Sequence, residues 1–367
     1  MKQRKVIALI LIGILFSVFI ASCDDGPGKQ ERTRTVTDVL GREVEIPETV
    51  ESIITLGSGA PRIAAYLDVT DMLVGAEEYD TGDVAVIRDY HPVHHELLKT
   101  LPLVGSGGGS GNNNGFPEEI IIVAPDVILA GFDAEAADEL QEQTGIAVVS
   151  VRHTTGLAPE SFYDAMRVFA DVVGARERCE AVLSYIDGLK EDLYNRTYSV
   201  PDDEKLSVYA GAVTWNGRRG FAGTYSVFGI FDAIHALNVA YTEDIDGFFE
   251  ADLESVIMWD PDIIFLDPGN MDLVNDEFAT NPGFFNSLRA VQEGRVYTLP
   301  AFNFAGTNMT YALINTYFAG TVLFPDQFAD IDIAEKAGEI LTMMLGTDTY
   351  DIMAKGGLFY GTITIGE

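Results

Sequence analysis

Cysteine and basic side chains are both scarce in this chain. Its 367 residues include two cysteines, Cys23 and Cys179, and two cysteines so placed offer no framework of disulfide bonds. Lysine and arginine together number 23 against 57 aspartates and glutamates, which gives a formal net charge of −34. A chain this acidic repels nucleic acid and anionic lipid surfaces at long range. We therefore expect no nucleic-acid partner.

The sequence signatures of several enzyme classes are also missing. The chain contains no G-x-S-x-G, no H-E-x-x-H and no Walker phosphate loop. An enzyme that works in a cleft needs a nucleophile with its base, or a catalytic metal shell. We therefore expect a protein that binds its ligand without transforming it, and we expect no cofactor.

The first 22 residues resemble an export signal. Three basic residues precede an apolar run from Val6 to Ile20, which is shorter than the ~20 residues of a membrane span. The run ends in Ala21-Ser22-Cys23, which resembles the cleavage site of a lipoprotein. We predict that residues 1–22 are removed and that a lipid on Cys23, with a tether over 23–34, anchors the body to the outer face of the cytoplasmic membrane. The alternative is an uncleaved anchor with a chance cysteine.

Short apolar segments alternate with helical stripes through most of the remaining chain. Apolar strands are predicted at Ser52–Leu56, in APDVILAGF and in GIAVVSVRH. Such alternation predicts an α/β fold with mainly parallel sheets. We place one α/β lobe at residues 35–158. A second lobe at 198–367 includes a helix at YSVFGIFDAIHAL and ends in a helical region from Thr310 to about Leu345.

Residues 159–197 differ from both lobes because they carry helical periodicity without strand signals. The second half of this stretch, Ala175 to Arg196, predicts a helix of 22 residues, which would be ~33 Å long. No other stretch is as long without turn signals. We therefore expect two Rossmann-like lobes that are joined by one long α-helix, with a ligand cleft between them.

One motif occurs twice, once in each predicted lobe. Residues 118–130 read EEIIIVAPDVILA and residues 254–266 read ESVIMWDPDIIFL. In each copy the glutamate begins a short helix, the Pro-Asp pair ends it, and a buried strand follows. Proline ends the helix because it disfavours helical geometry in the residue before it. The repeat indicates two lobes of similar design.

Several segments resemble one family of transport proteins. They are TDVLGREVEIP with ESIITL, LVGAEE, LPLVGSGG, the two copies of the repeat, ALNVAYTE and AVQEGRVYTLP. From Val36 to about Tyr350 the chain resembles the substrate-binding lipoproteins of ABC importers for iron–siderophore complexes, haem and cobalamin. GFAGTYSVF, GTNMTYALINTYF and FPDQFADID resemble the longer, iron-complex subgroup.

The resemblance implies a fold, a function and partners. The fold is that of two lobes with one long connecting helix, a shallow cleft and little closure. The function is capture of a small-molecule iron(III) chelate and its delivery to an ABC permease dimer with a cytoplasmic ATPase. Haem or a corrinoid is the alternative ligand. An extracytoplasmic enzyme that acts on a metal chelate and a purely structural lipoprotein are the rival functions.

The resemblance also assigns the repeated glutamates, Glu118 and Glu254, to docking on arginines of the permease. A second interpretation needs no partner. Glutamate in the first turn of a helix is favoured by the helix dipole, and Pro117 at a helix start and Asp252 as an N-cap fit that interpretation equally well. The two interpretations are compatible.

Ligand-binding residues are expected in the loops at the carboxyl ends of the strands. The richest loop, Trp215–Tyr225, combines aromatic faces with paired guanidinium groups, which suit a flat anionic chelate; it could equally be a solvated turn. Arg62 and Arg88 would pair with a ligand carboxylate or neutralise nearby acids. The predicted ligand-binding residues are Ser58, Arg62, Glu78, Arg88, Phe132, Trp215, Arg218, Arg219, Phe221, Tyr225, Asn303 and Phe304.

Three of the five histidines fall in one short segment, HPVHH, at His91, His94 and His95. Their spacing could place two imidazoles on one side of a helical turn. However, Pro92 disfavours helix at His91, and no cysteine or aspartate cluster completes a metal shell. We expect no metal site.

Overall fold

The computed structural model describes residues 32–108 and 114–367, of which Thr33–Glu367 form one compact unit. The predicted signal, the lipidated Cys23 and most of the tether lie outside the described residues, as does the middle of the glycine-rich loop GSGGGSGNNNG. No helix among the described residues has the length and apolar character needed to cross a membrane.

The first lobe is built on a parallel sheet of three strands in the order β3-β6-β7. Every residue of β3 and β6 is buried, as expected for strands covered on both faces. A parallel pair, β4 and β5, and an antiparallel hairpin, β1 and β2, complete the strands. The strands are β1 (Thr33–Thr37), β2 (Glu43–Pro47), β3 (Ile53–Leu56), β4 (Ala76–Glu77), β5 (Leu103–Gly105), β6 (Val127–Ala130) and β7 (Val148–Ser150).

Short helices connect these strands. They are α1 (Pro61–Tyr66), α2 (Glu78–Thr81), α3 (His91–Leu98), α4 (Pro117–Val123) and α5 (Ala134–Thr144), with a 3-10 turn at Thr70–Met72. The α5 helix begins at an N-cap, Asp133, whose side chain accepts a hydrogen bond from the Ala136 amide, and it ends at Gly145 in the left-handed conformation.

The second lobe repeats the design with a four-stranded parallel sheet in the order β10-β8-β12-β13, and β9 pairs antiparallel with β11 beside it. The strands are β8 (Ser207–Gly211), β9 (Gly223–Tyr225), β10 (Leu237–Asn238), β11 (Phe248–Glu250), β12 (Ile263–Leu266) and β13 (Val296–Thr298). The helices are α8 (Gly229–Asp232), α9 (Leu253–Trp259), α10 (Met271–Thr280), α11 (Pro282–Ser287), α12 (Arg289–Gln292), α13 (Met309–Leu323), α14 (Ile333–Leu345) and α15 (Tyr350–Lys355), with 3-10 turns at Asp202–Glu204 and Pro268–Asn270.

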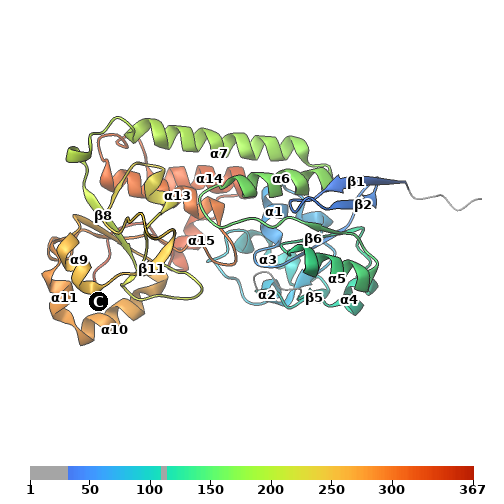
Figure 1. The fold of residues 1–367 in the computed structure, drawn as a ribbon, viewed down its shortest axis with the longest axis horizontal. Helices are drawn as coiled ribbons and strands as arrows, with labels where there is room; N and C mark the ends of the chain where they lie inside the picture. Colours follow the sequence, from blue (N-terminus) through green and yellow to red (C-terminus); the bar gives the residue numbers. More distant parts are fainter. Residues whose placement is uncertain (1–31, 109–113) are drawn as a thin grey trace, which may run out of the picture. The chain divides into compact units, whose positions relative to one another are not determined.

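Two helices join the sheets, α6 (Glu160–Val173) and α7 (Arg176–Thr197) (Figure 1). The long helix has 22 residues, as predicted, and begins one residue later than expected. Arg178 near its start donates to the carbonyl of Tyr66 on α1 and to that of Met343 on α14. Arg196 near its end pairs with Asp330. The α/β fold with mainly parallel sheets and a long connecting helix is therefore confirmed.

The structure explains the repeated motif. The helices α4 and α9 end at residues in the left-handed conformation, Ala124 and Asp260, directly before the two prolines. The aspartate that follows each proline bonds to the start of the neighbouring strand. Asp126 accepts from the Ser52 amide at 2.8 Å, and Asp262 accepts from the Ser207 amide at 2.9 Å. The repeat therefore serves the same local construction in each lobe.

Three local predictions were wrong. The C-terminal helical region is divided into α13 and α14, with Pro325 in the break between them. In the segment YSVFGIFDAIHAL only Gly229–Asp232 is helical. Tyr225 still belongs to strand β9, and His235 has a positive φ, which a right-handed helix does not allow. His91 does begin helix α3, and Pro92 is accommodated in the first turn, where an amide has no helical partner to lose.

Candidate functional site

A cavity of about 220 Å³ lies at the carboxyl ends of β3, β6 and β7. We call it the strand-end cavity. The residues after β3 contribute Gly57, Ser58 and Gly59, and those after β7 contribute Arg152 and His153. Carboxyl ends of parallel strands are the usual location of ligands in such sheets. Ser58 and Arg62, both predicted, line this cavity.

Arg62 is buried in the wall of the cavity and connects the two lobes. Its Nε donates to Asp89 at 2.9 Å, and its two terminal nitrogens donate to the carbonyl of Ala305 and to Oδ1 of Asn308, both at 2.8 Å. A longer bond reaches the carbonyl of Phe304 at 3.4 Å. Of the two roles predicted for Arg62, the structure shows the pairing with a nearby acid.

Asp89 is the centre of this buried network. Besides Arg62, it accepts hydrogen bonds from the hydroxyl groups of Tyr66 and Thr310 and from the amide of Tyr90. A buried charge is tolerated only when it is paired and its remaining lone pairs are bonded. Because Thr310 belongs to α13, the network fastens the first lobe to the start of a second-lobe helix.

Glu77 is a buried carboxyl beside the cavity loop that the sequence analysis missed. Its Oε1 accepts from the Gly57 amide at 2.9 Å. Burial raises the pKa of Glu77 to about 8, so this carboxyl is mostly uncharged at pH 7. The predicted neighbour, Glu78, is exposed on α2.

Arg152 and His153 were also missed. Arg152 is exposed, and no side chain or carbonyl of residues 32–108 and 114–367 pairs with its guanidinium group. Burial, together with the charge of Arg62, lowers the pKa of His153, so its ring is neutral at pH 7. Both residues end the segment GIAVVSVRH, in which a strand was predicted, but the observed strand ends at Ser150 and leaves them in the loop.

Arg88 does not line the strand-end cavity. Its guanidinium group is buried, donates to Asp80 and to the carbonyl of Tyr79 at 2.7 Å each, and lies 4.4 Å from the centre of the Tyr79 ring. It therefore neutralises a local acid, which is one of the two roles predicted for it.

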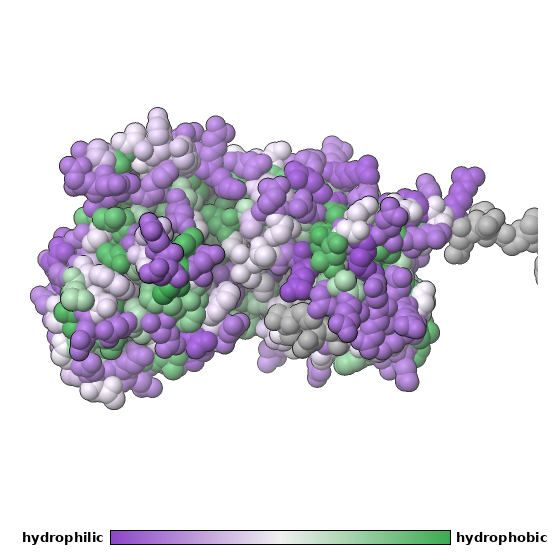
Figure 2. Space-filling model, viewed as in Figure 1, coloured by the Kyte–Doolittle hydropathy of each residue, from purple (hydrophilic) through white to green (hydrophobic). Residues whose placement is uncertain are grey.

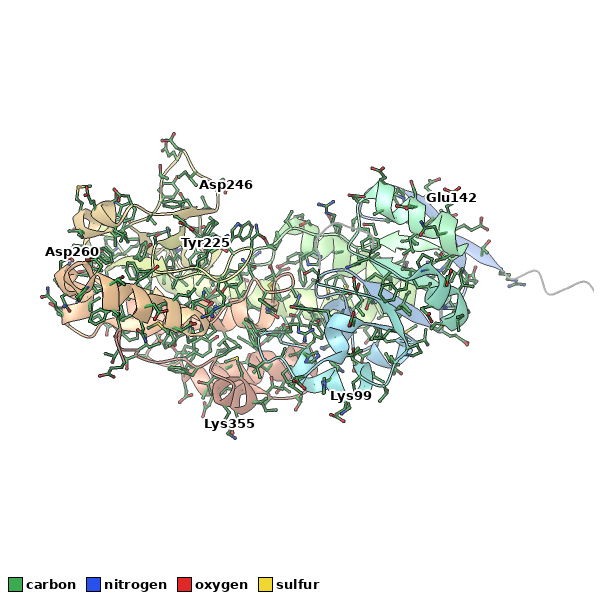
Figure 3. All side chains as sticks on the ribbon, turned by 90° about the horizontal axis from the view of Figure 1, so that it is seen from below. Lys99, Glu142, Tyr225, Asp246, Asp260 and Lys355 are labelled. Carbon is green, nitrogen blue, oxygen red and sulfur yellow. The ribbon has the colours of Figure 1, made fainter. Side chains whose placement is uncertain are left out.

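The loop after β8 forms an aromatic cluster in the second lobe. The half-buried Trp215 stacks on Phe248 with ring centres 6.2 Å apart, and Tyr225 (Figure 3) meets both rings edge to face. Arg219 lies over Phe248 and donates to the carbonyl of Trp215. Arg218 pairs with Asp272 and donates to Asn270.

The remaining predicted residues have different positions. Tyr225 and Asn303 line a small hollow of about 20 Å³, which is separate from the strand-end cavity. The half-buried Phe304 offers its carbonyl to Arg62. Phe132 and Phe221 are fully buried in hydrophobic clusters, so neither ring is accessible to a ligand in this structure. Their prediction as cleft residues failed because sequence position alone does not reveal which way a ring packs.

The histidine segment has a structural role. His91 is fully buried, and it accepts from the Ala85 amide at 3.0 Å through Nδ1 and reaches the carbonyl of Asp80 through Nε2. His95 likewise reaches the carbonyl of Gly82 through its Nε2. These bonds fasten residues 80–85 onto α3. Within the described residues, no group of three histidine, cysteine or carboxylate side chains is placed to hold a metal ion.

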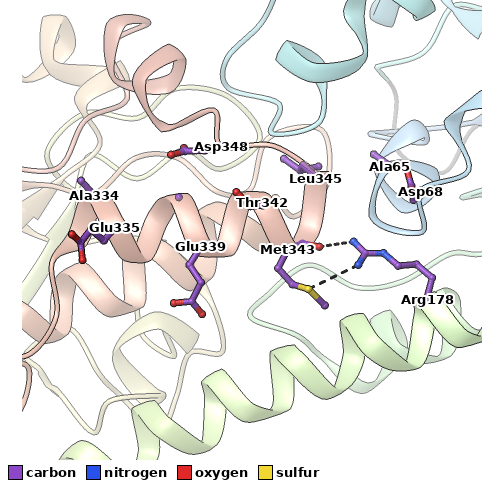
Figure 4. A pocket seen from close by; sticks show the side chains of 12 residues that line it. Ala65, Asp68, Arg178, Ala334, Glu335, Glu339, Thr342, Met343, Leu345 and Asp348 are labelled. Atoms are coloured by element: carbon purple, nitrogen blue, oxygen red, sulfur yellow. Dashed lines mark hydrogen bonds between the residues drawn. The ribbon is translucent and has the colours of Figure 1, made fainter.

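A larger hollow of about 790 Å³ lies between α1, α7 and α14 (Figure 4). It is lined by four carboxylates, those of Asp68, Glu335, Glu339 and Asp348. Its one guanidinium group, that of Arg178, already donates to two backbone carbonyls. This surface does not suit an anionic solute.

The repeated glutamates are exposed in the first turns of α4 and α9. Pro117 begins α4 and Asp252 caps α9 by accepting from the Glu254 amide, as predicted. Each glutamate is followed at the same spacing by two exposed apolar residues, although most of the visible surface is hydrophilic (Figure 2). Their exposed fractions match between the copies: Ile121 50% and Ile122 76%, against Ile257 43% and Met258 77%.

Comparisons with known proteins agree with this architecture. The molybdate-binding protein MolA of Haemophilus influenzae is 24% identical over 323 residues, which cover 82% of this chain and 87% of that protein. The Fe(3+)-citrate-binding protein YfmC of Bacillus subtilis is 23% identical over 312 residues, which cover 80% and 89%. The crystal structure of a periplasmic solute binding protein from Veillonella parvula matches with a TM-score of 0.69 at 18% identity, covering 89% of this chain and 97% of the other.

A family model adds the decisive match. The model described as periplasmic binding protein matches residues 53–301, which include both parallel sheets, the long helix and every residue that lines the strand-end cavity except Gly306. The match extends over more than half of the chain. The chain therefore belongs to the periplasmic binding protein family.

Proposed function

We propose that this protein captures an iron(III) chelate of the siderophore type outside the cytoplasmic membrane and delivers it to a membrane permease. Its family makes it the solute-binding component of an ABC transporter and not an enzyme. The family does not fix the solute, which has to be argued from the cavity.

The observation that carries the proposal is the charge of the strand-end cavity. It is lined by Arg62, whose charge Asp89 balances, and by Arg152, whose charge no described residue balances. No aspartate or glutamate among the described residues lines it, in a chain of net charge −34. Ferric chelates present anionic oxygen atoms, which guanidinium groups bind through charge-assisted hydrogen bonds. Two relatives support an oxygen-rich anion, because one is named for ferric citrate and the other for molybdate.

Haem or a corrinoid is the second candidate. The half-buried Trp215, which stacks on Phe248 in the second lobe, favours it because a flat macrocycle binds well to aromatic faces. Absorption spectra and mass spectra of the solute that co-purifies with the protein distinguish these candidates. A ferric chelate is expected. A Soret band would support haem. Uptake is measured separately in a strain from which the gene is deleted, and normal uptake there of ferric chelate, haem and corrinoid alike would contradict the receptor function.

Delivery requires docking, for which Glu118 and Glu254 are our candidates. Each carboxylate lies beside an exposed apolar pair, and the arrangement is the same on both copies of the repeat. A dimeric permease presents one surface twice. A partner with an arginine next to an apolar patch on each subunit would match both copies at once. The cytoplasmic ATPase would then act on the assembled complex.

We also propose that Cys23 carries the lipid anchor. The proposal depends on the Ala-Ser-Cys sequence after the apolar run. A diacyl group supplies two hydrocarbon chains, which is what stable residence at a membrane requires. The anchor would keep the protein close to its permease.

A further inference from the structure

The strand-end cavity differs in charge from other hollows of the described chain. The hollow between α1, α7 and α14 is lined by four carboxylates. A hollow near Arg196 is lined by five carboxylates, and one near Glu45 by three. The strand-end cavity includes two arginines and no carboxylate. The nearest buried carboxyl beside its glycine loop, that of Glu77, bonds the Gly57 amide and is mostly uncharged at pH 7.

The two arginines of the cavity are in different states. Arg62 uses four of its five N–H groups on Asp89, Ala305, Asn308 and Phe304. Its charge is balanced by Asp89 and it keeps few free donors, so it shapes the wall of the cavity more than its charge. Arg152 has no partner among the described residues, so all five of its N–H groups are available. An unpaired guanidinium group is unusual in a chain whose acidic side chains outnumber its basic ones by more than two to one.

The size of the cavity limits the ligand. Sites for drug-sized molecules occupy ~300–1,000 Å³, and this cavity measures about 220 Å³. Its wall at the lobe contact is closely packed. A Cβ atom at Gly59 would lie 2.1 Å from the Ala305 carbonyl, and one at Gly306 would lie 3.1 Å from Nη1 of Arg62. Widening the cavity at this wall would break the buried bonds of Arg62.

We propose that the strand-end cavity binds a compact, multiply charged oxygen anion through the free guanidinium group of Arg152. This inference rests on the proposed receptor function and narrows its solute class. Two sources share this chemistry, a tetrahedral oxyanion and the compact carboxylate chelate of a ferric ion. The planar fork of Arg152 bonds two oxygens of such an anion at once. Arg62, whose charge is balanced by Asp89, holds the opposing wall. The macrocycle of haem or of a corrinoid does not fit the cavity as a whole.

The test is titration calorimetry on the protein lacking its first 31 residues, with sodium molybdate, sodium sulfate, ferric citrate, haemin and cyanocobalamin as probes. We expect one of the first three to bind. Molybdate and sulfate report a tetrahedral oxyanion, and ferric citrate reports a carboxylate chelate. Arg152→Ala should weaken that binding about tenfold or more, because the anion loses at least one charge-assisted hydrogen bond. Arg152→Lys keeps the charge but not the planar, two-pronged guanidinium group, so its affinity should lie between those of the wild type and Arg152→Ala.

Arg176→Ala is the matched control. It removes the same charge from a guanidinium group that is paired with Asp171 and does not line the cavity, so its affinity should equal that of the wild type. The Arg152 side chain makes no hydrogen bond or ion pair within the described residues, so thermal unfolding of Arg152→Ala should be unchanged. Failure of all three small anions to bind would overturn the inference. Tight binding of haemin or cyanocobalamin that is indifferent to Arg152→Ala would overturn it too, while leaving the receptor function intact.

Discussion

Arg62 and Asp89 form an ion pair, 2.9 Å from Nε to Oδ1, that is shielded from solvent on both sides. The same guanidinium group donates to Ala305 and Asn308, so the pair joins the loops of the two lobes. A buried pair of this kind is costly to break, because removing one partner leaves the other charged and without compensation. The contact between the lobes therefore depends strongly on Asp89.

Asp89→Ala should destabilise the protein by about 3–5 kcal/mol, because Arg62 would remain buried and unpaired. Urea denaturation at pH 7 measures the free energy of unfolding. Asp272→Ala is the matched control, since it removes the exposed partner of Arg218, and exposed pairs contribute only ~0.2–1 kcal/mol. Equal losses in the two variants would contradict the importance that we give to the buried network.

Glu77 should make stability fall as the pH rises. Its folded pKa of about 8 lies above the ordinary value of 4.5, so the folded state holds a proton that the unfolded chain releases. This contribution is fully present below pH 4.5 and is lost as the pH rises through about 8, with a slope of at most about 1.4 kcal/mol per unit. Glu77→Gln stays neutral and keeps an oxygen for the Gly57 amide.

The measurement is the difference in unfolding free energy between Glu77→Gln and the wild type from pH 5 to pH 8. The variant should gain relative to the wild type as the pH rises. Burial lowers the pKa of His91 to about 4, which acts in the opposite direction below pH 6.5. Because both proteins contain His91, its effect cancels in the difference. Parallel curves would show that the Glu77 carboxyl is already charged in the fold.

Reversal of both docking residues, Glu118→Lys with Glu254→Lys, should reduce transport and leave solute affinity unchanged. Charges at the edge of an interface act mainly on association rate and salt dependence. Ile122→Ser with Met258→Ser should also reduce transport if the apolar pairs contact the permease. Glu119→Lys, which reverses an exposed charge next to Glu118, is the control. Normal transport together with a lowered melting temperature would leave the glutamates with a helix-stabilising role alone.

Cys23→Ser should abolish lipid attachment. Cells fed a fatty-acid analogue with a chemical handle should label the wild type and not the variant. The wild type should also be shorter than the full chain by the predicted signal. An unlabelled wild type of full length would identify the first residues as an uncleaved anchor.

The sequence predicted the structure correctly where one short segment determines the local fold by itself. Buried strands with two covered faces, such as Val127–Ala130, are continuous apolar runs, and the 22-residue helix carries its own periodicity. The cavity depends on loops that are distant in the sequence, so its members had to be inferred from a general rule. That rule identified Ser58 and Arg62 as cavity residues. It did not identify Arg152, because the Trp215 loop contains more aromatic and basic side chains and was chosen instead.

Two other errors in the predicted site residues came from not knowing which side of the chain a residue faces and which way an aromatic ring packs. Glu77 and Glu78 are adjacent, yet one ends a buried strand and the other begins an exposed helix, and a strand of two residues gives no pattern to separate them. Phe132 lies just after β6 and Phe221 lies in the loop between β8 and β9, as cleft residues would, but their rings fill the hydrophobic clusters. Those outcomes depend on packing partners far along the chain.

The single thiol among the described residues has a practical consequence. Burial raises the pKa of Cys179 to about 11, so at pH 7 roughly one thiol in ten thousand is the reactive thiolate. A protein that starts after Cys23 is thus nearly inert to maleimides, and cysteines introduced at Ile122 and Met258 would take up spin labels selectively. The distance between the two labels, recorded by pulsed electron resonance with and without solute, would measure directly how far the lobes move.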